Sequence, residues 1–78
     1  MMTFPSKNQS APALTPREVT CLYWAALGKT SKETAALLGL GSSTIEQYRK
    51  DIKRKLECRS MAEAVFKAMQ FGYIEPIL

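Results

Sequence analysis

The densest group of cationic side chains in this 78-residue chain lies between positions 49 and 59. Six of the 11 lysines and arginines fall there, namely Arg49, Lys50, Lys53, Arg54, Lys55 and Arg59. Ammonium and guanidinium groups bind phosphate through charge-assisted hydrogen bonds, and the whole chain carries a net charge of +4. The group therefore indicates a polyanion such as nucleic acid as the partner, although an acidic protein or a membrane surface would also fit. The simpler alternative is a charged helix face that is exposed to solvent and binds no partner.

The residue types on which most catalytic and metal sites depend are scarce in the sequence. It contains no histidine, which is the commonest general base and the commonest transition-metal ligand. Cys21 and Cys58 are too far apart to form a zinc-binding CxxC pair, and their apolar neighbours predict buried thiols rather than a disulfide. No apolar run is long enough for a membrane span. We therefore expect no catalytic site, no metal site, no cofactor and no membrane partner.

Helix-start signals recur along the chain after Leu14. A hydroxyl residue followed three positions later by glutamate is the sequence of a capping box, in which each side chain bonds the other's backbone N–H. This pattern occurs at positions 15–18, 30–33, 43–46 and 60–63, and Pro16 stands where a first helical residue is expected. For the third box, Gly41 or Ser42 is an equally good cap. Because glycines at 28, 39 and 72 mark helix ends, the pattern predicts an all-α fold of four helices.

The apolar residues of the predicted helices fall on single faces. In the third helix they follow the i, i+3, i+7, i+11 pattern of an amphipathic helix, at Ile45, Tyr48, Ile52 and Leu56. In the first helix the residues expected to face the core are Cys21, Leu22 and Ala25. In the fourth helix the expected apolar face consists of Ala62, Val65, Phe66, Met69 and Ala68.

The second and third predicted helices carry the spacing of a helix-turn-helix. Ala35 is small where two crossing helices approach each other, Gly39 suits the left-handed conformation of the turn, and Ile45 anchors the following helix. An ordinary pair of antiparallel helices is the alternative, but such pairs seldom carry a strongly basic face on the second helix. The outward residues at the start of the third helix are Glu46, Gln47 and Lys50. We predict that these three contact base edges.

Other polar residues around the turn are predicted to contact the DNA backbone. Some lie further along the third helix, and others lie at the N-terminus of the second helix, where backbone N–H groups attract anions. The predicted phosphate contacts are Thr30, Ser31, Lys32, Ser43, Thr44, Arg49, Lys53 and Arg54.

Over residues 14–74 the chain resembles the LuxR/GerE-type helix-turn-helix domain. The matching positions are Leu14, Thr15, Pro16, Arg17, Glu18, Gly28, Lys29, Thr30, Lys32, Glu33, Ala35, Leu38, Gly39, Thr44, Ile45, Lys55, Leu56 and Ala64. Trp24 followed by the Gly-Lys-Thr at 28–30 is most similar to the quorum-sensing branch of that family. The chain departs from the family's usual pattern at Gly41, Glu46, Tyr48 and Asp51.

The resemblance implies a particular use of the third and fourth helices. The third helix would enter the major groove, with Glu46 and Lys50 at base-contacting positions. The fourth helix, at 61–71, would pair with its twin in a dimer, and the apolar residues predicted at that interface are Val65, Phe66 and Met69. Family members normally carry a sensory domain upstream. Residues 1–13, predicted to be a flexible arm, are too short to form one, and residues 75–78 are predicted to be a tail.

Two functions are compatible with these expectations. The first is a sequence-specific transcriptional regulator in the bacterial cytoplasm, bound to double-stranded DNA of the nucleoid as a weak homodimer on a roughly palindromic site. The alternative is a protein-interaction module that forms a heterodimer with a longer LuxR-type regulator and modulates it.

Overall fold

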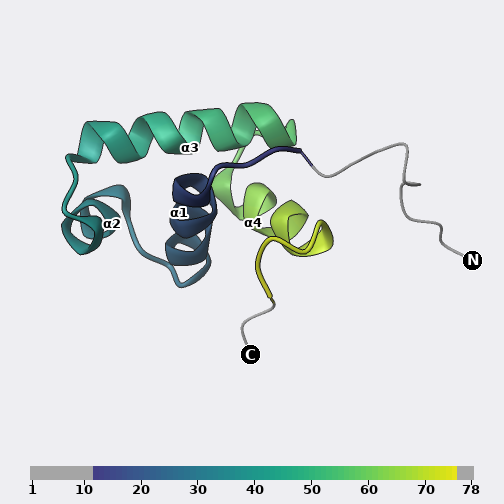
Figure 1. Ribbon diagram of the computed structural model, residues 1–78, viewed down its shortest axis with the longest axis horizontal. Helices are drawn as coiled ribbons and strands as arrows, with labels where there is room; N and C mark the ends of the chain where they lie inside the picture. Colours follow the sequence, from purple (N-terminus) through teal and green to yellow (C-terminus); the bar gives the residue numbers. More distant parts are fainter. Residues whose placement is uncertain (1–11, 76–78) are drawn as a thin grey trace, which may run out of the picture.

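The computed structural model describes residues 12–75, and within this range it contains four helices and no strand (Figure 1). The helices are α1 (Pro16–Ala26), α2 (Ser31–Leu38), α3 (Ser42–Leu56) and α4 (Met61–Gln70). The predicted all-α, four-helix fold is thus confirmed. The arm predicted at 1–13 lies outside the described residues apart from Pro12 and Ala13, as does the predicted tail apart from Glu75. None of the four helices has the length and apolar character needed to cross a membrane.

The longest helix, α3, lies across the other three. Figure 1 shows α3 along the upper edge, with α2, α1 and α4 beneath it. Each of these three helices contacts α3, and α1 also contacts α2 and α4. One side of α3 is therefore buried along its length, while the opposite side is open to solvent.

Two of the predicted capping boxes form as expected, at the starts of α1 and α2. The hydroxyl of Thr15 accepts from the backbone N–H of Glu18, whose carboxylate accepts from the N–H of Thr15; Thr30 and Glu33 do the same. At α4 only half of the box forms. The Ser60 hydroxyl caps the N–H of Glu63, whose carboxylate accepts from the N–H of Arg59 at 3.2 Å.

The capping box predicted at 43–46 does not form, and of the caps that the sequence left open it is Gly41 that is the N-cap of α3. The turn from α2 already ends at Gly41, whose carbonyl accepts from the N–H groups of Thr44 and Ile45, so Ser43 lies inside the first turn. Among residues 12–75, no side chain makes a capping hydrogen bond at this helix start. The first turn of α3 also contains no acidic residue, unlike the first turns of α1 and α2, so the positive end of its dipole is not offset by a nearby carboxylate.

The predicted helix ends are confirmed, since Gly28, Gly39 and Gly72 all have positive φ. Helix α3 ends differently, because Glu57 follows it with a φ of 54°, a conformation that costs a non-glycine residue about 1 kcal/mol or more. The ammonium of Lys67, on α4, donates to the carbonyls of Leu56 and Glu57 at 2.9 and 3.0 Å. Lys67 thus caps the C-terminus of α3 and ties α4 to it.

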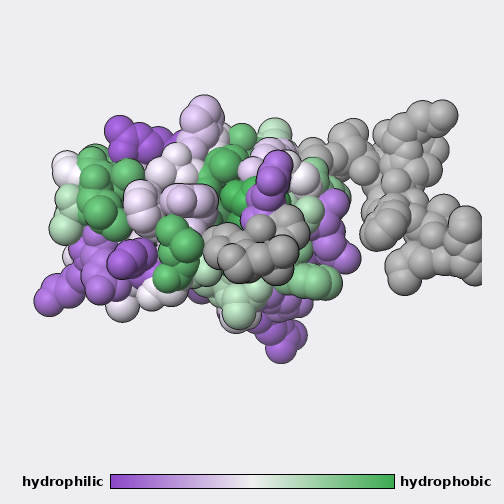
Figure 2. Space-filling view, turned by 90° about the horizontal axis from the view of Figure 1, so that it is seen from below, coloured by the Kyte–Doolittle hydropathy of each residue, from purple (hydrophilic) through white to green (hydrophobic). Residues whose placement is uncertain are grey.

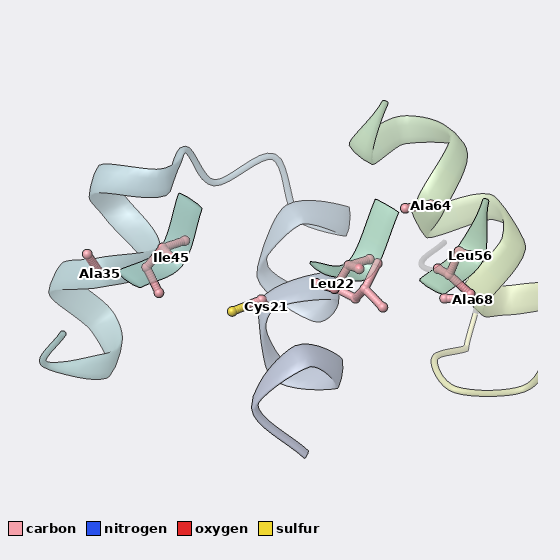
Figure 3. Close-up of a cluster of buried hydrophobic side chains, with 8 residues drawn as sticks. Cys21, Leu22, Ala35, Ile45, Leu56, Ala64 and Ala68 are labelled. Atoms are coloured by element: carbon pink, nitrogen blue, oxygen red, sulfur yellow. The ribbon is translucent and has the colours of Figure 1, made fainter. Parts of the chain in front are cut away.

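One hydrophobic core joins all four helices (Figure 3). Its buried members are Cys21, Leu22, Ala35, Ile45, Ile52, Leu56, Ala64 and Ala68. In Figure 3, Cys21 and Leu22 point to opposite sides of α1, the first toward Ala35 and Ile45 and the second toward Leu56 and Ala68. The faces predicted for α1 and α3 are confirmed in outline, although Ala25 and Tyr48 are only partly buried.

The apolar face predicted for α4 is wrong in part. Ala64 and Ala68 are fully buried, whereas Ala62 is exposed and Phe66 is 57% exposed. Two apolar stripes overlap on α4, one that contains Ala64 and Ala68 and one that contains Phe66. Because alanine lets the backbones approach closely, the stripe with the smaller side chains packs inward and Phe66 is left outside.

Besides Phe66, the exposed large apolar side chains are Tyr23, Leu27 and Leu37. Figure 2 views the molecule from the side opposite α3 and shows hydrophobic side chains at separate places, with hydrophilic ones between and around them. Scattered apolar side chains of this kind are normal on a protein surface.

Candidate nucleic-acid interface

The outer side of α3 brings together the three residues predicted to contact bases. Glu46, Gln47 and Lys50 are all exposed, and with Ser43 and Lys53 they line one shallow depression along the helix. On the opposite side Ile45 and Ile52 are fully buried, so the rotation of α3 about its axis is fixed. A donor-acceptor amide, a carboxylate and an ammonium can therefore approach the same ligand surface from one rigid helix. Their contact with bases stays a prediction.

Arg49, predicted to contact phosphate, is engaged within the domain. Its side chain is half-buried, and Nη2 donates to the carbonyl of Lys29 in the α1–α2 loop at 2.9 Å. Lys29 immediately precedes Thr30, the N-cap of α2. Arg49 therefore links α3 to the start of α2, so that the two predicted contact elements keep a fixed spacing.

A buried ion pair, absent from the sequence-based expectations, holds the other half of α3. The ammonium of Lys55 lies 2.9 Å from Oε1 of Glu18 on α1, and the two side chains are 26% and 4% exposed. The same carboxylate oxygen accepts from the N–H of Thr15. A signal for this burial exists in the sequence, because Glu18 lies three and four residues before Cys21 and Leu22 and hence on the core face of α1.

Asp51 forms a second network on the outer side of α3. Its Oδ1 accepts from Nε2 of Gln47 at 3.1 Å and from Nη2 of Arg54 at 3.3 Å. In the sequence, Asp51 stands out only as a departure from the LuxR/GerE pattern. The signal for the network is spacing, since residues three and four positions apart lie side by side on a helix.

The start of α2 offers hydroxyl, amide and ammonium groups. Thr30 and Lys32 are exposed and Ser31 is half-buried. The capping box already uses the Thr30 hydroxyl as an acceptor. The bond from the Thr30 N–H, more than any other interaction, lowers the pKa of the Glu33 carboxyl below its ordinary value. This helix start therefore carries a firmly ionised glutamate beside the lysine.

The residues predicted at a dimer interface lie on one side of α4 without forming a fully exposed patch. Phe66 is exposed, while Val65 and Met69 are half-buried. Val65 also packs against the core, so its side chain serves the fold of the single chain. Phe66 is the member of this group with the most surface available to a partner.

Both cysteines are free thiols, Cys21 buried and Cys58 half-buried. Burial raises the pKa of each above its ordinary value, which disfavours the reactive thiolate. Within residues 12–75 there is no group of three or more cysteine and acidic side chains that could hold a metal ion.

Comparison with known proteins gives consistent matches. The family described as bacterial regulatory proteins, luxR family (GerE), matches residues 12–68. The HTH-type quorum sensing-dependent transcriptional regulator VjbR of Brucella abortus is 44% identical over 68 residues, covering 87% of this chain and 26% of that protein. The transcriptional activator protein AhyR of Aeromonas hydrophila is 38% identical over 66 residues, covering 85% and 25%. The chain thus spans about a quarter of the length of these relatives.

Solved structures agree on the fold. The phage VqmA–DPO complex superposes with a TM-score of 0.72 at 32% identity, covering 85% of this chain and 30% of that chain. The Vibrio cholerae VqmA–ligand–DNA complex gives a TM-score of 0.73 over 99% of this chain and 33% of that chain. At 22% identity, this second likeness shows the fold alone.

Proposed function

The chain belongs to the luxR family of bacterial regulatory proteins, and on this premise we propose that it is a sequence-specific, DNA-binding regulator of transcription. VjbR and AhyR, two of its relatives, are named as transcriptional regulators. The observation that carries the proposal is the joint exposure of Glu46, Gln47 and Lys50 on one rigid side of α3. An outward row of polar side chains on the second helix of a helix-turn-helix is the arrangement with which such motifs contact bases in the major groove.

Each of the three side chains suits a particular base edge. The ammonium of Lys50 matches the O6 and N7 acceptors of guanine, and the amide of Gln47 matches the N6 donor and N7 acceptor of adenine. The carboxylate of Glu46 can accept from N4 of cytosine. Each good bidentate contact of this kind discriminates against a wrong base by about 1–3 kcal/mol.

Contacts with the DNA backbone would come from two helix starts and from the last turn of α3. We assign Ser43 and Thr44 to phosphate because no side chain among residues 12–75 caps the start of α3, and helix N-termini bind anions. The other proposed phosphate contacts are Lys53 and Arg54 on α3 and Thr30, Ser31 and Lys32 on α2. We assign Arg49 to the spacing of these two helices instead, since its guanidinium already donates to Lys29.

We further propose that DNA brings two copies together as a weak homodimer through α4. Phe66, exposed on this helix, is the main apolar side chain at that contact, with Met69 beside it. A two-fold arrangement of this kind requires a roughly palindromic site with a fixed half-site spacing. The place of action would be the bacterial nucleoid.

The test is selection of binding sites from a random-sequence duplex pool by the 78-residue protein, at two salt concentrations. The proposal predicts enrichment of a palindromic site and loss of affinity with rising salt, with a slope of about −0.9 for each phosphate contact. Salt-sensitive binding without enrichment would contradict it and would favour a partner-dependent role, such as a heterodimer with a longer regulator.

Two variants separate base contacts from phosphate contacts on the selected site. Lys50→Ala is expected to relax the preference at one base pair by about 1–3 kcal/mol. Lys53→Ala, its matched control on the same helix, is expected to weaken binding to all sequences alike. If both variants changed selected and random DNA equally, the base-contacting role of Lys50 would be lost.

A further inference from the structure

One carboxylate on the outer side of α3 is bonded to two of the side chains to which the proposed function gives DNA contacts. Oδ1 of Asp51 accepts from Nε2 of Gln47 at 3.1 Å and from Nη2 of Arg54 at 3.3 Å. Gln47 lies one helical turn before Asp51, and Arg54 lies almost one turn after it. The side chain of Asp51 is 30% exposed and that of Arg54 is 69% exposed, so both of these side chains remain within reach of a ligand.

The bond to Gln47 fixes the orientation of its amide. A glutamine amide can rotate by half a turn, which exchanges its oxygen acceptor and its two N–H donors. An ionised carboxylate only accepts, so Asp51 selects the orientation in which the amide nitrogen points toward it. One N–H and the oxygen then remain for another partner, and adenine needs one donor and one acceptor. The Gln47 side chain therefore loses less conformational freedom when it binds adenine.

The bond to Arg54 acts in the opposite direction on total affinity. An exposed guanidinium within reach of DNA gains affinity for any sequence by contacting phosphate. Here the Asp51 carboxylate competes for that guanidinium, and its own negative charge repels phosphate. The pair thus removes part of the attraction that does not depend on sequence.

We propose that Asp51 is a specificity-determining residue, which positions Gln47 for adenine and partly withholds Arg54 from phosphate. Its effect is weaker binding to random DNA together with a stronger preference for the correct base. The inference rests on the proposed function, because it assumes that the outer side of α3 contacts bases.

Two substitutions distinguish the two actions of the carboxylate. Asp51→Asn keeps an oxygen acceptor for Gln47 but removes the charge, whereas Asp51→Ala removes both. Dissociation constants are measured by fluorescence anisotropy for the selected duplex, for its single-base-pair variants and for a random duplex, over a range of salt. The base pair that Gln47 contacts is identified with Gln47→Ala. Thermal melts check that each variant is folded.

For Asp51→Ala we expect the preference at the Gln47 base pair to fall about two- to tenfold, the cost of ordering one long side chain. Asp51→Asn should lower that preference by at most about twofold, because asparagine still bonds Gln47 but can do so in either orientation of its amide. Both variants should bind random DNA more tightly, with a salt slope steeper by up to about 0.9, because Arg54 is then fully available to phosphate. On the Gln47→Ala background, Asp51→Ala should leave the preference unchanged.

An unchanged base preference in Asp51→Ala would overturn the positioning of Gln47. An equal loss of preference in Asp51→Ala and Asp51→Asn would overturn it too, because charge rather than the hydrogen bond to Gln47 would then be responsible. An unchanged salt slope in both variants would overturn the withholding of Arg54. A wild-type protein without any base preference would instead contradict the proposed function itself.

Discussion

Replacing Lys55 by methionine should destabilise the domain strongly, because it leaves the buried carboxylate of Glu18 without its charged partner. The pair is 2.9 Å apart, and Glu18 is only 4% exposed. Removing one partner of a buried ion pair costs about 3–5 kcal/mol. Since Lys55 is 26% exposed and Glu18 keeps the N–H of Thr15, we discount this figure for solvent to about 2–3 kcal/mol. A domain of this size has a total stability of about 4–12 kcal/mol.

The assay is urea unfolding followed by circular dichroism, with the midpoint and slope fitted for each variant. With a slope of about 1 kcal/mol/M, the midpoint of Lys55→Met should fall by about 2 M or more at unchanged slope. Lys50→Met, an exposed lysine on the same helix, is the matched control and should stay within about 0.5 kcal/mol of the wild type.

A second substitution tests whether the unpaired charge of Glu18 causes this loss of stability. Glu18→Gln removes the charge but keeps an acceptor for the N–H of Thr15, since glutamine also forms capping boxes. In the Lys55→Met background it should recover most of the lost stability, because no uncompensated charge remains buried. The buried charge would not be the cause if Lys55→Met lost no more stability than Lys50→Met, or if Glu18→Gln made the Lys55→Met protein less stable still.

Three further predictions concern single positions, each measured by the same urea unfolding. Thr34 is fully buried and its hydroxyl has no hydrogen-bond partner among residues 12–75, so Thr34→Val should raise the free energy of unfolding by about 1 kcal/mol; a decrease would contradict this. Glu57→Gly should stabilise the protein by about 0.5–1 kcal/mol, because glycine relieves the positive φ, and a loss of stability would show that the conformation carries no strain. Glu33 has a lowered pKa in the folded protein, so its contribution is present near pH 7 and is lost as the pH falls through that pKa in the acid range. The stability difference between wild type and Glu33→Gln should therefore shrink on acidification, and a constant difference would contradict the lowered pKa of Glu33 in the folded protein.

The features that could be predicted from the sequence are those that depend on neighbouring residues. Thr15 and Glu18, three positions apart, specify a helix start by themselves, and Gly39 specifies the turn between α2 and α3 through its backbone freedom. The outward direction of Lys50 follows from helix periodicity once the buried side containing Ile45 is known. Most of the fold, and the side of α3 that is the candidate for contacting bases, depend on such patterns among neighbouring residues.

The features that could not be predicted depend on how the helices pack. The pairing of Glu18 with Lys55 joins positions 37 apart, and the bond from Arg49 to the Lys29 carbonyl joins positions 20 apart. Sequence spacing contains no information about such distances until the crossing of α1 and α3 is known. For the same reason the sequence could not decide between the two apolar stripes of α4, where close approach of the backbones favours small side chains over Phe66.

Mapping where DNA binds the protein tests the role of α3 most directly. The 15N-labelled 78-residue chain would be titrated with its selected duplex, and the backbone amide shifts followed by NMR. We expect the largest shifts along the outer side of α3, from Ser43 to Arg54, and at the start of α2, from Thr30 to Lys32. Smaller shifts are expected at Phe66 where two copies meet. Shifts confined to residues outside α2 and α3 would contradict the assignment of α3 as the helix that contacts bases.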